Sequence, residues 1–153
     1  MALYVVQHGK SLPKEQDPGK GLSSAGIEET ERIAEVAKGY AVSVARMIHS
    51  GKKRALQTAE IFGAALCPGK GIDVQAGMKP LDDVRPFAER LPLDQNVMLV
   101  GHLPFLERLI GLLVCEQPDQ TVFKLQNSGI VCLGRVPQLD HLVIRWALMP
   151  HIG

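Results

Sequence analysis

The chain has 153 residues, 46% of them hydrophobic, and a formal net charge of +1. This length and composition suit one domain, residues 1–153, with a core of its own. So small a net charge gives no global field that attracts nucleic acid or an anionic membrane, and any anion site must depend on local charge. No apolar run reaches the ~18–20 residues of a membrane span, and the N-terminus lacks the pattern of a signal peptide.

The cysteines are Cys67, Cys115 and Cys132. Their spacing is not that of a metal site, and each lies in an apolar context, so we predict three reduced thiols in the core. The expectation is a cytoplasmic protein that needs no metal or other cofactor.

The first half of the chain alternates between strand and helix patterns. Residues 3–7 (LYVVQ) are an apolar, β-branched run typical of a strand buried on both faces. A Pro- and Gly-rich loop over residues 10–22 separates it from a helix that begins at Ser23 or Ser24 and ends near Gly39. A second strand is expected within residues 41–50, and a second helix over residues 53–66.

The second half continues this alternation and ends in a hairpin. The pattern predicts a short strand within 72–78, a short helix over 84–91, a strand over 96–101, a helix over 103–115 with Pro104 in its first turn, and strands over 130–136 and 141–149. We therefore predict a three-layer α/β/α sandwich with a mostly parallel sheet and an antiparallel hairpin.

Chemically versatile side chains follow three of the predicted strands. These segments are Gln7-His8-Gly9, the stretch from His49 to Arg54, and Gly101-His102. Ligands of open α/β sheets bind at the carboxyl ends of the strands, so the three segments are expected to meet on one rim. Arg54 opens a predicted helix and His102 precedes another, which favours an anion at the helix N-termini. The sequence therefore predicts a phosphate site built without a metal.

Two imidazoles at such a site can have different roles. A neutral ring nitrogen of His8 can attack phosphorus if its other nitrogen carries the proton and donates it to an acceptor such as a backbone carbonyl. His102 would have its full effect if protonated, because it would then stabilise charge on the phosphoryl oxygens. Arg54 can hold two of those oxygens through its planar guanidinium.

These motifs resemble the histidine phosphatase, or phosphoglycerate mutase-like, superfamily. Its signatures are an apolar strand ending in Arg-His-Gly, a Ser-x-x-x-Arg-Ala-x-Gln-Thr-Ala stretch, and Val-Gly-His. The chain has QHG at residues 7–9, SGKKRALQTA at 50–59 and VGH at 100–102. The short length and the segment VGHLPFLERLI resemble the SixA-type branch of phosphohistidine phosphatases.

The resemblance implies a phosphoglycerate mutase-like fold and a metal-independent phosphatase. His8 would be the nucleophile that forms a phosphohistidine intermediate, and Arg54 and His102 would complete the catalytic set. Phosphate would be bound by Gln7, Gly9, Arg54 and His102. The expected partners are a protein carrying phosphohistidine, or a small phosphorylated substrate, with phosphate or sulfate as simple ligands of the pocket.

Two features set this chain apart from the family pattern. Larger members carry a general acid in an insertion that this chain is too short to hold, and Asp82 and Asp83 are the candidates for that role. A phosphorylated imidazole needs less protonation to leave than an alkoxide does, so a site without a certain acid suits phosphohistidine better than a sugar phosphate.

The second feature is Gln7, which stands where the family has arginine. It keeps hydrogen-bond donors but loses a charge, so we expect a weakened enzyme, with Lys10, Lys52 or Lys53 as partial replacements. The alternatives that remain open are a phosphoester phosphatase with the same mechanism and a non-catalytic module that binds phosphate or phosphohistidine.

Overall fold

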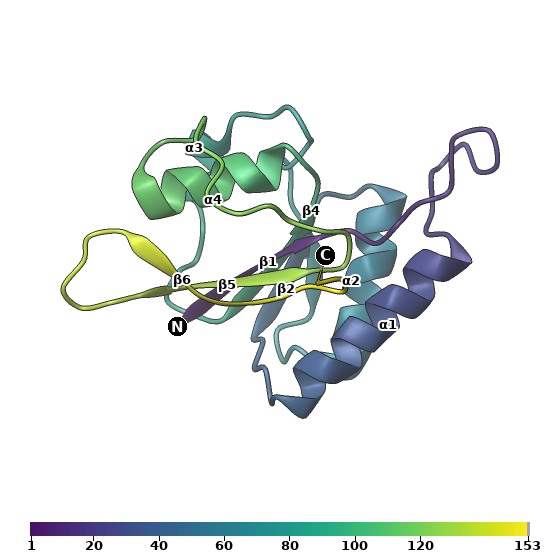
Figure 1. The fold of residues 1–153 in the computed structure, drawn as a ribbon, viewed down its shortest axis with the longest axis horizontal. Helices are drawn as coiled ribbons and strands as arrows, with labels where there is room; N and C mark the ends of the chain where they lie inside the picture. Colours follow the sequence, from purple (N-terminus) through teal and green to yellow (C-terminus); the bar gives the residue numbers. More distant parts are fainter. Residues whose placement is uncertain (153) are drawn as a thin grey trace.

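A single six-stranded sheet forms the middle layer of the computed structural model, which describes residues 1–152 (Figure 1). The strands are β1 (Ala2–Gln7), β2 (Arg46–His49), β3 (Ile72–Val74), β4 (Val97–Gly101), β5 (Ile130–Arg135) and β6 (Leu142–Leu148). They lie in the order β3-β2-β4-β1-β5-β6. The first four are parallel, whereas β5 runs antiparallel to both β1 and β6.

Helices cover both faces of the sheet and complete the predicted α/β/α sandwich. They are α1 (Ser24–Gly39), α2 (Lys53–Leu66), α3 (Val84–Glu89) and α4 (Phe105–Cys115). In Figure 1, α1 and α2 lie on one side of the sheet, and α3 and α4 lie on the other. No helix among residues 1–152 has both the length and the apolar character to cross a membrane.

The strand pattern explains why two cores form. Along β1, Leu3 and Val5 belong to the apolar cluster under α3 and α4, whereas Tyr4 and Val6 belong to the cluster under α1 and α2. Because successive side chains of a strand point to opposite faces, a continuous apolar run is needed where both faces are covered. This is why residues 3–6 are all apolar and all buried.

Local signals at the helix ends agree with the predictions, with one exception. Ser23 is the N-cap of α1, where its hydroxyl accepts a hydrogen bond from the Gly26 N–H at 3.0 Å. Of the three cysteines predicted to lie in the core, Cys132 is buried and Cys115 is partly buried, whereas the prediction was wrong for Cys67, which is exposed. It ends α2 in the left-handed conformation, with φ of 48°, so its side chain leaves the apolar face of the helix.

Sheet register brings the predicted site segments together. Gln7 of β1 pairs with Gly101 of β4, so His8 and His102 follow adjacent parallel strands at the same level. On the other side of β4, Val100 pairs with His49 of β2. The loop that leads into α2 therefore begins at the same edge of the sheet.

Candidate active site

The backbone around His8 is held by hydrogen bonds from three directions. The His8 N–H donates to the Gly101 carbonyl at 3.0 Å, and the Asn127 side-chain amide donates to the His8 carbonyl at 2.8 Å. The next N–H, that of Gly9, donates to the Thr58 hydroxyl at 2.9 Å. These bonds come from β4, the segment before β5, and α2, so they fix the imidazole relative to the sheet and the helix.

The imidazole of His8 has a defined tautomer. Its Nδ1 lies 2.7 Å from the carbonyl oxygen of Gly9, which can only accept, so Nδ1 carries the proton and donates it. Nε2 is therefore unprotonated, and it accepts a hydrogen bond from Nε of Arg54 at 3.3 Å. Nε2 therefore keeps the lone pair that a nucleophilic histidine requires, and this lone pair faces the guanidinium.

His102 stands beside this ring at the end of β4. The two ring centroids are 5.0 Å apart at an interplanar angle of 51°, and His102 is 2% exposed. Its Nε2 lies 2.5 Å from the hydroxyl of Ser50, while its buried Nδ1 has no hydrogen-bond partner among residues 1–152. Ser50 therefore orients the ring, and one buried polar atom is left for a further partner.

Both imidazoles are held neutral at neutral pH. Burial lowers the pKa of His8 to about 4, against the opposing effect of its bond to Gly9, and the nearby charges of Arg54 and Lys20 lower it further. Burial also lowers the pKa of His102 to about 3, assisted by His8, Arg54, Lys52 and Lys20. Burial and the surrounding positive charge therefore favour the neutral form of His102. A phosphate anion beside the rings would raise both pKa values, because it favours the charged form.

Gln7 lies at the end of β1 and is partly buried. Strand alternation places its side chain on the face that carries Leu3 and Val5. Its Oε1 is buried and accepts no hydrogen bond from residues 1–152. The position thus holds a polar group with unsatisfied capacity and no positive charge.

The two candidate acids have local partners. Asp83 is the N-cap of α3, and its carboxylate accepts from the Arg85 N–H at 3.0 Å. The Asp82 carboxylate accepts from the Lys79 N–H at 2.8 Å. Each therefore stabilises its own turn, and their role as an acid stays a prediction.

Among the lysines proposed to replace the missing arginine, two are paired with carboxylates. Lys10 lies 3.7 Å from Glu29, and Lys53 lies 2.8 Å from Asp17. Lys52 is close enough to contribute to the lowered pKa of His102. The charge of Lys52 thus reaches the site, whereas those of Lys10 and Lys53 are largely compensated.

The structure adds residues that the sequence reasoning did not single out. They are Lys20, Ser50, Thr58 and Asn127. Ser50 and Thr58 belong to the SGKKRALQTA motif, so the motif itself was a signal for them. Lys20 and Asn127 lie in loops without a recognisable pattern, and only the folded chain brings the Asn127 amide to the His8 carbonyl and the charge of Lys20 within electrostatic range of the ring.

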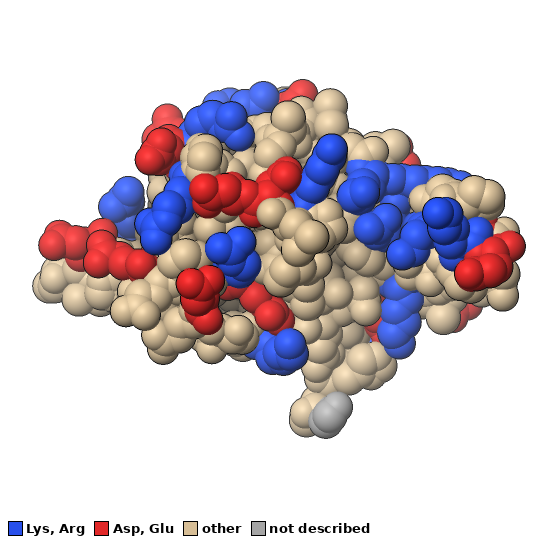
Figure 2. All heavy atoms as spheres, turned by 90° about the horizontal axis from the view of Figure 1, so that it is seen from above, with Lys and Arg blue, Asp and Glu red and all other residues tan. Residues whose placement is uncertain are grey.

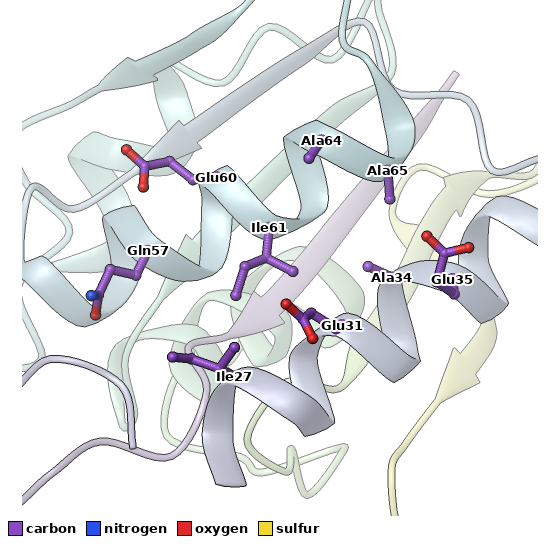
Figure 3. A pocket seen from close by; sticks show the side chains of 9 residues that line it. All are labelled: Ile27, Glu31, Ala34, Glu35, Gln57, Glu60, Ile61, Ala64 and Ala65. Carbon is purple, nitrogen blue, oxygen red and sulfur yellow. The ribbon is translucent and has the colours of Figure 1, made fainter. Parts of the chain in front are cut away.

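A separate groove of about 640 Å³ lies between α1 and α2 (Figure 3). Its apolar residues include Ile27, Ile61 and Ala64, and Glu31, Glu35 and Glu60 also line it. Three carboxylates disfavour a phosphate anion, so this groove is a poorer candidate for an anion site than the rim that carries His8.

Comparisons with known proteins identify relatives of this chain. No family model matches the chain. The phosphohistidine phosphatase SixA of Escherichia coli (strain K12) is 30% identical over 157 aligned positions, which cover 98% of this chain and 94% of that protein.

Solved structures show the same fold. The protein histidine phosphatase SixA complexed with tungstate superposes with a TM-score of 0.85 at 24% identity, over 98% of this chain and 97% of the other. Phosphoserine phosphatase from Entamoeba histolytica, in complex with 3-phosphoglyceric acid, superposes with a TM-score of 0.69 at 17% identity, over 95% of each chain. The fold is therefore that of the histidine phosphatase, or phosphoglycerate mutase-like, class. Within that class, the chain belongs to the SixA phosphohistidine phosphatase family.

Proposed function

We propose that this chain is a single-domain, metal-independent phosphatase that removes phosphate from phosphohistidine on a protein, with His8 as its nucleophile. The observation that carries the proposal is the state of His8. Its Nδ1 proton is committed to the Gly9 carbonyl at 2.7 Å, and its Nε2 lone pair faces Arg54 at 3.3 Å. Both a nucleophile and a cation for the phosphoryl oxygens are thus in place.

The reaction has two steps. In the first, Nε2 of His8 attacks phosphorus, an N–P bond forms, and the N–P bond of the substrate breaks. A substrate imidazole that is protonated on its other nitrogen leaves as a neutral molecule, so this step needs no acid from the enzyme. In the second step, water attacks the phosphorus of phospho-His8, the bond to His8 breaks, and inorganic phosphate leaves.

The other site residues act on the phosphoryl oxygens. Arg54 donates two hydrogen bonds through its guanidinium, and the buried His102 donates from its ring as the anion raises its pKa. Gln7, at the end of β1, and Gly9, two residues later, bind the phosphoryl group from the β1 side of the site. Asp82 and Asp83 remain candidates only for a substrate that needs a general acid.

Phosphohistidine on a protein is favoured as the substrate for two reasons. The SixA protein of Escherichia coli, which is 30% identical to this chain, is a phosphohistidine phosphatase. The short chain also has no insertion to close over a small molecule, so the site suits a side chain presented by another protein. The three free cysteines favour work in the reducing cytoplasm.

The test is a phosphatase assay on a phosphohistidine protein and on a generic phosphomonoester, with wild type beside His8→Ala. We expect turnover of the phosphohistidine substrate by wild type, slower turnover of the ester, and loss of both in His8→Ala. His141→Ala, in the turn between β5 and β6, is the matched control and should retain full activity. A preference for the ester would contradict the assigned substrate.

A trapping experiment separates an enzyme from a binding module. Rapid acid-free quenching with a ³²P-labelled phosphodonor should place label on wild type and on His141→Ala but not on His8→Ala. Phosphate binding without label on His8 would show that the chain binds the group and does not transfer it.

A further inference from the structure

The groove between α1 and α2 has an apolar surface that is open to solvent. Figure 3 shows Ile27 of α1 and Ile61 of α2 directed into the space between the helices, and Ala64 extends this surface along α2. Ile27 is 37% exposed, and Ala64 is exposed as well. The groove is therefore a surface feature rather than a part of the core, and it is accessible to a partner.

Three glutamates border this apolar surface, Glu31 and Glu35 on α1 and Glu60 on α2. None of them forms an ion pair with a lysine, arginine or histidine among residues 1–152. Glu31 and Glu35 are four residues apart on one helix, where two like charges repel each other. A cationic partner in the groove would relieve this repulsion and pair with all three carboxylates.

The shape of the groove fits a helix. In Figure 1, α1 and α2 lie side by side on one face of the sheet, and the residues of α2 that line the groove run from Gln57 to Ala65. At the rise of an α-helix, this stretch is about 12 Å long, or roughly two turns. An amphipathic helix binds such a groove through apolar residues spaced three and four apart, and basic residues beside them would meet the glutamates.

One end of the groove lies next to the proposed phosphatase site. Gln57 is three residues after Arg54 on α2, which is about 4.5 Å along the helix axis. Its side chain accepts from the Leu22 N–H at 2.7 Å, so it also holds the end of the loop that follows His8. A helix in the groove would therefore end close to the site.

The charge of the surface changes sign between these two places. In Figure 2, Lys and Arg side chains gather at the right-hand end of the molecule, where the loop that follows His8 projects. The groove carries three carboxylates instead. A partner that presents a phosphoryl group to the site and basic side chains to the groove would complement both.

We infer that this groove docks a basic, amphipathic helix of the protein whose phosphohistidine is hydrolysed at His8. The groove holds the helix while the site receives the phosphorylated side chain, so part of the specificity lies outside the catalytic residues. Because the partner is the substrate protein, the inference rests on the proposed function. The docking groove is defined by Ile27, Glu31, Glu35, Glu60, Ile61 and Ala64.

A designed helical peptide tests the docking groove without turnover. It carries leucines at positions i, i+3, i+4 and i+7 with lysines on both flanks, and a matched peptide carries glutamates in place of the lysines. Calorimetric titration of wild type should show binding of the lysine peptide, binding of the glutamate peptide that is at least about tenfold weaker, and loss of the difference in high salt. Equal affinities at low salt would refute the docking of a basic helix.

Variants of the chain locate the bound peptide. The double change Glu31→Lys and Glu35→Lys should weaken the lysine peptide about tenfold, because it turns attraction into repulsion. The double change Glu89→Lys and Asp140→Lys alters the net charge equally at exposed positions outside the groove and should bind as wild type does. Equal weakening in both would contradict the assignment. A wild-type dimer that dissociates in Ala64→Tyr would assign the groove to a second copy of the chain instead.

Kinetics connect the docking groove to the substrate. The two peptides, each extended by a glycine linker and a phosphohistidine, serve as substrates beside free phosphohistidine. The Glu31→Lys and Glu35→Lys variant should raise KM for the lysine peptide about tenfold and hydrolyse free phosphohistidine as wild type does, which also shows that it folds. An unchanged KM would overturn the inference and leave the proposed function standing. Binding of the lysine peptide by a protein that hydrolyses no phosphohistidine would support the groove and refute the proposed function.

Discussion

Arg54 and His8 are joined by a hydrogen bond in which the guanidinium Nε donates to the imidazole Nε2 over 3.3 Å. The Arg54 group that is proposed to bind phosphate is thus hydrogen-bonded to the His8 nitrogen that is proposed to attack it. A phosphoryl oxygen that accepts from Arg54 replaces this bond and leaves the lone pair of Nε2 directed at phosphorus. In the proposed mechanism, substrate binding therefore also frees the nucleophile.

Substitution of Arg54 should impair the reaction far more than it impairs folding. We expect Arg54→Ala to lower kcat/KM about 10²- to 10³-fold, as for other donors lost from a charged transition state. Arg54→Lys should recover only part of this loss, since a point charge cannot hold two oxygens in one plane. Steady-state kinetics on a phosphohistidine protein provide the measurement, with Arg85→Ala on the exposed side of α3 as the control. An Arg54→Ala variant as active as the control would contradict the mechanism.

Acid should destabilise the protein through its two imidazoles. Burial lowers the pKa of His8 to about 4 and that of His102 to about 3, whereas unfolded imidazoles titrate near 6.5. As the pH falls through about 6.5, the unfolded chain takes up protons before the folded chain does. The stabilisation is therefore fully present above about pH 6.5 and is lost progressively as the pH falls toward 4.

Urea unfolding at pH values from 7.5 to 4.5 measures this effect. The free energy of unfolding should fall across that range in wild type and fall less steeply in His8→Asn. Identical slopes in the two proteins would indicate that His8 titrates normally in the folded chain. Saturating inorganic phosphate should flatten the slope in wild type, because the bound anion raises the imidazole pKa values.

Gln7→Arg should increase activity. A hydrogen bond to a charged group contributes about 1.5–3 kcal/mol, against about 0.5–1.5 kcal/mol for a neutral one. If the difference acts on the transition state, kcat/KM rises roughly tenfold, and up to a hundredfold if the whole charge is effective. Gln7→Met is the matched control, because it keeps the length of the side chain and removes its polar atoms. A flat response to both changes would show that position 7 does not reach the phosphoryl group.

Thr58 should couple stability to activity. Its hydroxyl accepts from the Gly9 N–H at 2.9 Å and donates to the Arg54 carbonyl at 2.8 Å, so it joins the backbone of the nucleophile to that of the cation. Thr58→Val keeps the shape but leaves a buried N–H unpaired, which should lower the free energy of unfolding by about 1–3 kcal/mol and reduce kcat. Thr58→Ser should restore both. Loss of stability with unchanged kcat would limit Thr58 to a structural role.

Local sequence signals were sufficient for the layers of the fold and for the elements within it. The continuous apolar run of β1 and the Ser23 cap of α1 depend on interactions within a few residues, so they can be read from the chain directly. The same holds for the candidate site, because ligands of such sheets lie at the strand ends and His8 and His102 each follow an apolar strand. Cys67 was misjudged because its exposure depends on a left-handed residue at the helix end rather than on the surrounding composition.

Thus the sequence by itself determined the α/β/α class, the residues that end its strands, and the family to which their motifs point. Only the tertiary structure decided that Arg54 contacts Nε2 of His8 and that burial lowers the pKa of His102. The physical reason is that burial, tautomer and the distances between charges depend on segments far apart in the chain, which become neighbours only when the sheet register aligns them.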